Sequence, residues 1–267
     1  MRRLIQRFDP SLHYIMLSDE GEPLTFKEAR LCEHKKKWEL AMQEEIKALH
    51  ANDTWDLVDL PKDRKAIPNK WVYKIKTVDG KPKYKARLVA KGYAQTEGID
   101  FQEVFSPMVK MTTLRVLFAL TAAMDLELFQ MDVKTAFLHG DLDEELYMRQ
   151  PEGYVIPGKE KQVCKLKRSL YGLKQAPRQW YKKFDAFILK HELKRSHADH
   201  CLYTKKDVDG NPIILVLYVD DMLLAGKEKN AREFLKPSSY CLCLDTDDHI
   251  SIVIKITTIK FVRLDIF

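Results

Sequence analysis

The sequence lacks any apolar run approaching the roughly 20 residues that a membrane-spanning helix needs. Its basic start, residues 1–7, also lacks the apolar stretch of a secretory signal. Cysteine is scarce, with five scattered residues among 267, and internal repeats and low-complexity tracts are absent. An odd number of widely spaced cysteines argues against a disulfide framework and favours reduced thiols. We therefore expect an intracellular protein, cytoplasmic or nuclear.

Net charge is only +6, but the basic residues are concentrated in two segments. Residues 62–91 hold 11 Lys and Arg against 2 acids, and residues 161–195 hold the same numbers. Two basic segments on an otherwise acidic body indicate a polyanionic partner such as nucleic acid. Ordinary solvated surface is the alternative for either segment taken alone.

Two adjacent carboxylates, Asp220 and Asp221, interrupt an apolar segment at residues 213–226. Short apolar runs rich in β-branched residues are typical of buried strands, so the Asp-Asp pair is predicted at the tip of a β-hairpin. Two like charges beside apolar strands are costly unless a cation neutralises them. A divalent metal is one interpretation, because Mg²⁺ is held by one or two carboxylates plus substrate phosphates. A solvated hairpin turn is the other.

A basic hairpin is predicted between residues 71 and 91. Residues 71–76 and 84–91 alternate with a period of two, and Asp79-Gly80 is typical of a turn between them. The alternation gathers cations on one face of each strand: Lys74 and Lys76 on the first, and Lys85, Arg87 and Lys91 on the second. Such a row suits a phosphate backbone or a triphosphate, with a merely soluble hairpin as the alternative.

Helical periodicity marks residues 24–50, about 112–124, and the segment that follows Pro177. The expected buried positions are Trp38, Ala41/Met42, Ile46 and Leu49 in the first helix, Leu114, Leu117/Phe118 and Thr121 in the second, and Trp180, Phe184 and Phe187/Ile188 in the third. Pro177 suits a first helical turn.

Asp132 stands where the alternation of residues 126–132 ends, so it is predicted at the end of a strand. If this strand pairs with the Asp220 hairpin, three carboxylates could hold two cations about 3.5–4 Å apart, the arrangement used in phosphoryl transfer. A second group of metal-ligand types, His197, Asp199, His200 and Cys201, is better explained by loop and strand packing.

Three segments resemble the successive motifs of reverse transcriptases: QMDVKTAFL at residues 130–138, SLYGLKQAPR at 169–178 and YVDD at 218–221. The resemblance is more specific in the flanking segments, residues 70–74, 84–92 and 105–107, which are similar to the polymerase region of copia-type retrotransposon polyproteins. The resemblance covers about residues 24–236 in unbroken order.

This resemblance implies an α+β, right-hand polymerase fold with fingers and a palm built on an antiparallel sheet. It implies an RNA-directed DNA polymerase that uses an RNA or DNA template-primer, deoxynucleoside triphosphates and two Mg²⁺ ions, with Mn²⁺ as a substitute. The implied catalytic and metal-binding residues are Asp132, Asp220 and Asp221. The implied nucleotide-binding residues are Lys85, Arg87, Phe137, Tyr171, Gly172, Lys174, Tyr218 and Val219, with either Lys85 or Arg87 on the triphosphate. Phe137 matches the bulky residue that excludes a 2′-hydroxyl. Template contacts are expected at Lys74, Lys76 and Lys91.

The sequence departs from the family at both ends. Residues 1–23 are expected to form a poorly ordered leader, and residues 237–267 an unrelated tail that need not fold. The thumb and the RNase H domain are then absent, as in a degenerate or mis-spliced fragment. The alternative function is a catalytically inactive remnant that still binds nucleic acid. A different two-metal phosphotransferase would leave residues 171–178 unexplained.

Overall fold

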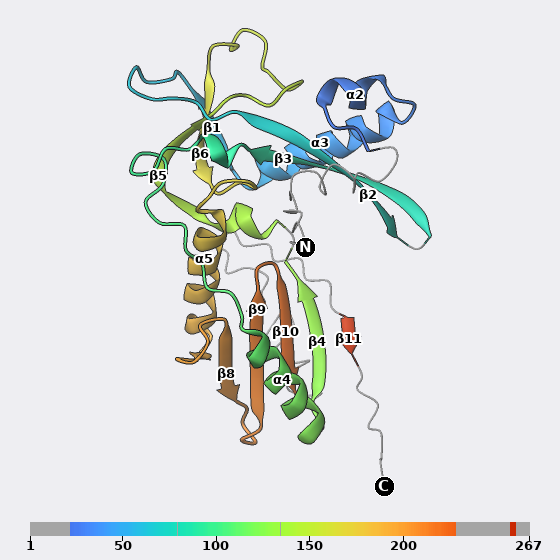
Figure 1. Ribbon diagram of the computed structural model, residues 1–267, viewed down its shortest axis with the longest axis vertical. Helices are drawn as coiled ribbons and strands as arrows, with labels where there is room; N and C mark the ends of the chain where they lie inside the picture. The colour runs from blue at the N-terminus through green and yellow to red at the C-terminus, as the bar shows by residue number, and fades with distance from the viewer. Residues whose placement is uncertain (1–21, 79, 134, 228–256, 260–267) are drawn as a thin grey trace, which may run out of the picture.

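The computed structural model describes residues 22–78, 80–133, 135–227 and 257–259 of the chain. Helices combine with sheets whose named strands all pair antiparallel within this part (Figure 1). This confirms the α+β class and the antiparallel sheet. No helix in the same ranges has the length and apolar character to span a membrane.

The largest sheet has the strand order β11–β4–β10–β9–β8–β7. Its strands are β4 (Glu127–Asp132), β7 (Lys194–Arg195), β8 (Leu202–Lys206), β9 (Pro212–Tyr218), β10 (Asp221–Gly226) and β11 (Thr257–Ile259). Helices α4 (Met111–Ala123) and α5 (Ala176–Lys190) lie against it (Figure 1). Phe184 of α5 contacts the ring of Tyr203 on β8, whereas α4 adjoins Thr204, the next residue of that strand. Because successive side chains of a strand point to opposite faces, the two helices cover opposite faces of the sheet.

Coverage on both faces explains why the apolar run of β9 is continuous rather than alternating. All residues from Ile213 to Leu217 are buried, and the adjacent β10 buries Met222 and Leu224. They share one core with Trp180, Phe184 and Ile188 of α5, which confirms the stripe predicted for that helix. In α4, Leu117 and Thr121 are buried as expected, but Phe118 is 39% exposed, so its predicted inward position is wrong.

A second core joins the basic hairpin to the N-terminal helices. Strands β2 (Asn69–Val78) and β3 (Lys81–Ala90) pair along their whole length, and α3 (Lys35–Ala51) packs beside β3. Trp71 and Tyr73 of β2 are buried with Trp38 and Leu49 of α3, which confirms the predicted apolar faces of both elements.

The single helix predicted for residues 24–50 is instead two helices, α2 (Phe26–Leu31) and α3. The backbone of Cys32 is extended (φ −73°, ψ 163°), and this ends α2. Thr25 begins α2 by accepting a hydrogen bond from the amide of Glu28, whose carboxylate in turn accepts one from the Leu24 amide. Such a reciprocal cap fixes the start of a helix, and the interruption lets α3 take its own direction along β3.

A third sheet, β1–β6–β5, lies beside the second core (Figure 1). It consists of β1 (Trp55–Val58), β5 (Asp141–Met148) and β6 (Val163–Arg168). Two short 3₁₀ turns connect these elements: η1 (Gly92–Ala94) follows β3, and η2 (Ala136–His139) lies between β4 and β5 in the chain. Phe137 of η2 packs against both large cores, so it stands at the junction between them.

Cys32, Cys164 and Cys201 are free, in agreement with the expected reduced thiols. Burial raises the pKa of Cys164 and of Cys201 to about 12, so both thiols stay protonated and unreactive at neutral pH. Residues 1–21 of the predicted leader and most of the predicted tail, including Cys241 and Cys243, lie outside the described residues.

Candidate active site

Asp132 and Asp221 face each other across two neighbouring strands. Asp132 is the last residue of β4, as predicted, and Asp221 is the first residue of β10 and its direct partner in the antiparallel register. Such partners have Cα atoms about 4.5–5.5 Å apart. The Asp220 carbonyl accepts a hydrogen bond of 2.9 Å from the amide of Val133, which ties the hairpin to the strand that carries Asp132. The structure thus brings the three predicted carboxylates to one end of the sheet.

The hairpin tip differs from the prediction by one residue. Tyr218 pairs with Asp221, so the loop consists of Val219 and Asp220 rather than of the two aspartates. Val219 has a positive φ of 58°, a conformation that β-branched residues rarely adopt. Thr135, three residues after Asp132, also has a positive φ, of 55°. Backbone strain in two β-branched residues beside the same carboxylates is typical of functional sites.

A tryptophan of α5 holds this strained turn. The indole Nε1 of Trp180 donates a 2.6 Å hydrogen bond to the Val219 carbonyl, and the ring itself is almost fully buried in the core beneath the sheet. A buried indole N–H needs an acceptor, so this bond satisfies both groups and fixes the loop between β9 and β10.

Burial and the proximity of like charges both destabilise the ionised form of Asp221. Burial raises its pKa above the ordinary value, the negative charge of Asp220 and of Asp132 raises it further, and a hydrogen bond from Gln130 acts in the opposite direction. A divalent cation would relieve this repulsion, and carboxylate oxygens are the ligands that Mg²⁺ prefers. The donor chemistry therefore fits the expected metal. No group of three or more His, Cys, Asp or Glu side chains within the described ranges is arranged as a ready metal-binding shell.

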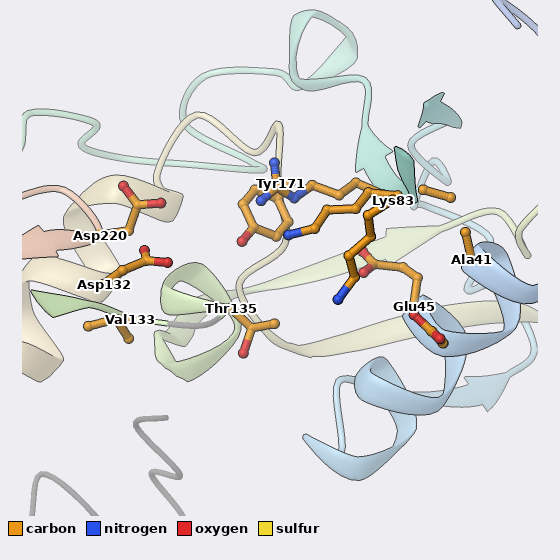
Figure 2. Close-up of a pocket in the computed structure, with 12 residues that line it drawn as sticks. Ala41, Glu45, Lys83, Asp132, Val133, Thr135, Tyr171 and Asp220 are labelled. Atoms are coloured by element: carbon orange, nitrogen blue, oxygen red, sulfur yellow. The ribbon is translucent and has the colours of Figure 1, made fainter. Parts of the chain in front are cut away.

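A cavity of about 270 Å³ opens beside these carboxylates. Figure 2 shows Asp132 and Asp220 at one end of it, Lys83 and Glu45 at the other, and Tyr171 between them. The residues that line it come from β4 and the segment after it, the hairpin tip, β3, α3 and the loop before α5: Ala41, Glu44, Glu45, Lys83, Lys85, Ala86, Arg87, Asp132, Val133, Thr135, Tyr171 and Asp220.

The wall formed by β3 is positively charged. In the register of the basic hairpin, Lys74 is opposite Lys85 and Lys76 is opposite Lys83, so the lysines of both strands lie on one face. Partial burial lowers the pKa of Lys85, and the nearby Lys76, Arg87 and Lys83 lower it further, while Asp132 acts in the opposite direction. The cavity thus has the carboxylates of Asp132 and Asp220 at one end, and a group of cations together with Glu45 at the other.

Arg87 and the aromatic residues define the middle of the cavity. The Arg87 guanidinium lies 5.0 Å from the centre of the Tyr171 ring, within the range of a cation–π interaction. Tyr171 in turn contacts Phe137 edge to face, with 5.2 Å between the ring centroids. Both Lys85 and Arg87 line the cavity, so the geometry does not select one of them over the other.

Several predicted site residues do not line the cavity. Lys174 lies with its Nζ 4.4 Å from the centre of the Phe101 ring, and Gly172 (φ 89°) packs against the backbone of Ala90. The other predicted site residues that do not line the cavity are Asp221, Phe137, Tyr218, Val219, Lys74, Lys76 and Lys91. Gly172 has a structural reason to be glycine, since a Cβ there would lie 2.2 Å from the Ala90 carbonyl oxygen.

Other residues of the cavity were missed from the sequence. Lys83 alternates with Lys85 and Arg87 along one strand, so the period of two could have identified it. Glu44 and Glu45 of α3 had no such signal, because they reach the cavity only through the packing of α3 beside β3.

In the second group of metal-ligand types, Asp199 has a structural role, as expected. One carboxylate oxygen of Asp199 accepts hydrogen bonds from the Lys110 amide (2.9 Å) and the Thr113 hydroxyl (2.6 Å), and the other accepts one from the Cys201 amide (3.0 Å). Asp199 thereby caps the start of α4 from a distant loop.

Comparison with known families identifies the chain's relatives. Residues 52–238 match the profile of the family described as reverse transcriptase (RNA-dependent DNA polymerase). The chain is 52% identical over 237 residues to the retrovirus-related Pol polyprotein from transposon TNT 1-94 of Nicotiana tabacum. It is 39% identical over 218 residues to that of transposon RE1 of Arabidopsis thaliana, and 30% identical over 208 residues to the transposon Ty1-ER2 Gag-Pol polyprotein of Saccharomyces cerevisiae.

These alignments cover 88%, 80% and 74% of this chain but only 18%, 14% and 11% of the three relatives, so the chain spans less than a fifth of their length. Among solved structures, it resembles a foamy viral protease–reverse transcriptase in complex with double-stranded DNA. That similarity has a TM-score of 0.37 and 15% identity over 73% of this chain and 27% of the other.

Proposed function

Because this chain belongs to the reverse transcriptase (RNA-dependent DNA polymerase) family, we propose that it carries the nucleotidyl-transfer centre of a copia-type retrotransposon polymerase. In this proposal the β4–β10–β9–β8 sheet with α4 and α5 is the palm, and the β2–β3 hairpin with α3 belongs to the fingers, all within residues 24–236. One observation carries the proposal: Asp132 lies opposite Asp221 at the edge of a cavity whose far wall displays Lys83, Lys85 and Arg87.

The reaction is the addition of a deoxynucleotide to a primer. The primer 3′-hydroxyl loses its proton to water, and its oxygen forms a bond to the α-phosphorus of the incoming triphosphate. The bond from that phosphorus to the α–β bridging oxygen breaks, and pyrophosphate leaves with that electron pair. Asp132, Asp220 and Asp221 would hold two Mg²⁺ or Mn²⁺ ions, which when bound make the 3′-hydroxyl more acidic and stabilise the developing negative charge.

The cationic wall would bind the triphosphate. Lys85 and Arg87 neutralise its charge, and the guanidinium of Arg87 suits a phosphate because it offers donors in a planar fork. The contact of Arg87 with the Tyr171 ring holds that fork in the cavity. The charge of the leaving pyrophosphate is stabilised by the same cations, so they favour the transition state as well as binding.

The aromatic pair would contact the sugar and the base. Phe137, packed edge to face on Tyr171, would exclude a 2′-hydroxyl and so favour deoxynucleotides. Gly172 and Lys174 would border the nucleotide and the template, and Tyr218 and Val219 the primer end. Lys74, Lys76 and Lys91 would contact phosphates of the template-primer.

A primer-extension assay tests the proposal. The purified chain with oligo(dT) on poly(rA), dTTP and Mg²⁺ or Mn²⁺ is expected to extend the primer, and the Asp220→Ala variant is expected not to. Extension that survives this substitution would exclude the carboxylates as the reaction centre.

A catalytically inactive nucleic-acid-binding protein is the second candidate. One observation favours it. Within the described ranges, no three His, Cys, Asp or Glu side chains are grouped so that they could hold a metal ion. In that case the chain binds a labelled primer-template with an affinity that falls steeply with salt concentration, and no extension follows. Substitution of Lys76 by Gln should then reduce the salt dependence, whereas extension by the wild type would eliminate this candidate.

A further inference from the structure

Glu45 of α3 holds the open edge of the strand that displays the cations. Among the described strands, β3 pairs with β2 along one edge and with no strand along the other, so alternate amides on that other edge need acceptors from elsewhere. The Leu88 amide donates to Oε1 of Glu45 over 3.2 Å, and the Ala90 amide donates to the Tyr171 carbonyl over 2.8 Å. These two bonds fix the strand to α3 and to the Tyr171 loop immediately after Arg87.

The Glu45 carboxylate also interacts electrostatically with Arg87 and Tyr171. Burial raises the pKa of Glu45, whereas the bond from the Leu88 amide and the charge of Arg87 lower it. Burial likewise raises the pKa of Tyr171, Arg87 lowers it and Glu45 raises it again. The three side chains therefore influence one another electrostatically, and all of them line the cavity.

We propose that Glu45 is a positioning residue for nucleotide binding: by accepting the Leu88 amide bond, it keeps β3 in the place where Arg87 stacks on Tyr171 and faces the triphosphate. This inference rests on the proposed function of the cavity. The negative charge of Glu45 repels a triphosphate in the cavity and so opposes its binding. The hydrogen bond from the Leu88 amide is the physical reason why a carboxylate is present there.

Two effects of Glu45 on nucleotide affinity have opposite signs, so they can be separated. If Glu45 acted only through its charge, its removal would strengthen the binding of an anionic triphosphate. If it acts through the strand, loss of the acceptor leaves the Leu88 amide unpaired and frees Arg87, and binding weakens. The Gln substitution removes the charge but keeps an acceptor, while the Ala substitution removes both.

The first measurement is the dissociation constant of dTTP with Mg²⁺ by calorimetry on the full chain. Glu45→Ala is expected to weaken binding about tenfold, which corresponds to ~1.4 kcal/mol and to the loss of one partly buried hydrogen bond. Glu45→Gln should bind at least as tightly as the wild type. The matched variant Glu44→Ala removes the same charge from the same cavity and should not weaken binding. In an Arg87→Ala background, Glu45→Ala should have no additional effect.

The second measurement reports on Arg87 without any nucleotide. A 3-fluorotyrosine incorporated at position 171 gives a ¹⁹F resonance that is sensitive to the guanidinium beside the ring. Glu45→Ala should shift this resonance in the same direction as Arg87→Ala, and Glu45→Gln should leave it close to its original position. Circular dichroism and a urea midpoint confirm that each variant is folded.

The inference is overturned if Glu45→Ala binds dTTP as tightly as the wild type or more so, if Glu45→Gln is as weak as Glu45→Ala, or if the Glu45→Ala and Arg87→Ala losses add independently. Absence of dTTP binding by the wild type would instead refute the proposed function, and the ¹⁹F resonance would still decide the role of Glu45.

Discussion

Trp180 and Val219 are joined by a 2.6 Å hydrogen bond from the indole Nε1 to the backbone carbonyl. This single contact connects the buried face of α5 with the two-residue loop that presents Asp220. Because Val219 has a positive φ of 58°, the loop is strained and depends on its surroundings to keep its shape. The bond links the packing of the core directly to the proposed chemistry.

Trp180→Phe should therefore impair both stability and primer extension. The variant leaves the Val219 carbonyl without its donor, a loss of about 1–3 kcal/mol in the free energy of unfolding. Trp38→Phe is the matched control, because Trp38 is also fully buried but its Nε1 has no hydrogen-bond partner in the described structure. Urea denaturation should show that the control loses stability through packing alone. Extension by the control should be faster than extension by Trp180→Phe. Equal extension rates for the two variants would mean that the bond does not position the hairpin.

Asp221→Asn should make the fold more stable and the polymerase inactive. The folded protein raises the pKa of Asp221, so its ionised form opposes folding at neutral pH, and a neutral amide removes that opposition. The urea midpoint at neutral pH is expected to rise, while extension falls by at least about 10²-fold, as for loss of one electrostatic group at a reaction centre. The exposed Asp63→Asn should change neither quantity, and a lower midpoint for Asp221→Asn would contradict the expected repulsion.

Phe137→Ala should relax the choice between deoxyribonucleotides and ribonucleotides. The ring packs on Tyr171 beside the cavity, and its removal opens space for a 2′-hydroxyl. The ratio of kcat/KM for dTTP over UTP is expected to fall by about tenfold or more, mainly through better use of UTP. The exposed Phe105→Ala serves as the control. An unchanged ratio would place the sugar away from Phe137.

Asp199 should contribute a pH-dependent part of the stability. Burial alone would raise its pKa, but hydrogen bonds from Thr113, Lys110 and Cys201 lower it below the ordinary value. An acid with a depressed pKa in the folded state stabilises the fold above its ordinary pKa of about 3.9, and this contribution is lost as the pH falls through the folded value.

Asp199→Asn is therefore expected to cost about 1–2 kcal/mol near pH 7. The difference from the wild type should shrink as the pH is lowered below about 4, and urea denaturation over this range measures it. The exposed Asp209→Asn is the control. A difference that stays constant with pH would show that the charge of Asp199 is not what stabilises α4.

The parts of the site that follow from local periodicity were predictable from the sequence. The end of β4 at Asp132 and the lysine face of the basic hairpin both come from alternation along a strand, and the structure places both as expected. The continuous apolar run of β9 correctly indicated a buried strand, although its two covering helices could not be identified from it.

The rest depended on tertiary packing. Glu45 carries no pattern that distinguishes it from other helix-surface acids, and it acquires a role only because α3 lies along the open edge of β3. The contact of Lys174 with Phe101 joins residues far apart in the sequence, so no local pattern could predict it. The break between α2 and α3 depends on the extended backbone of Cys32, which apolar periodicity does not report.

The pairing of β11 with β4 has a consequence for handling the protein. Residues Thr257–Ile259 occupy the outer side of the strand that carries Asp132. Without them, β4 would present a row of unpaired amides and carbonyls to solvent, and such a row is a template for association with another chain. Shortened versions of the polypeptide that omit these residues would therefore expose this edge of β4, and they are expected to self-associate increasingly as concentration rises.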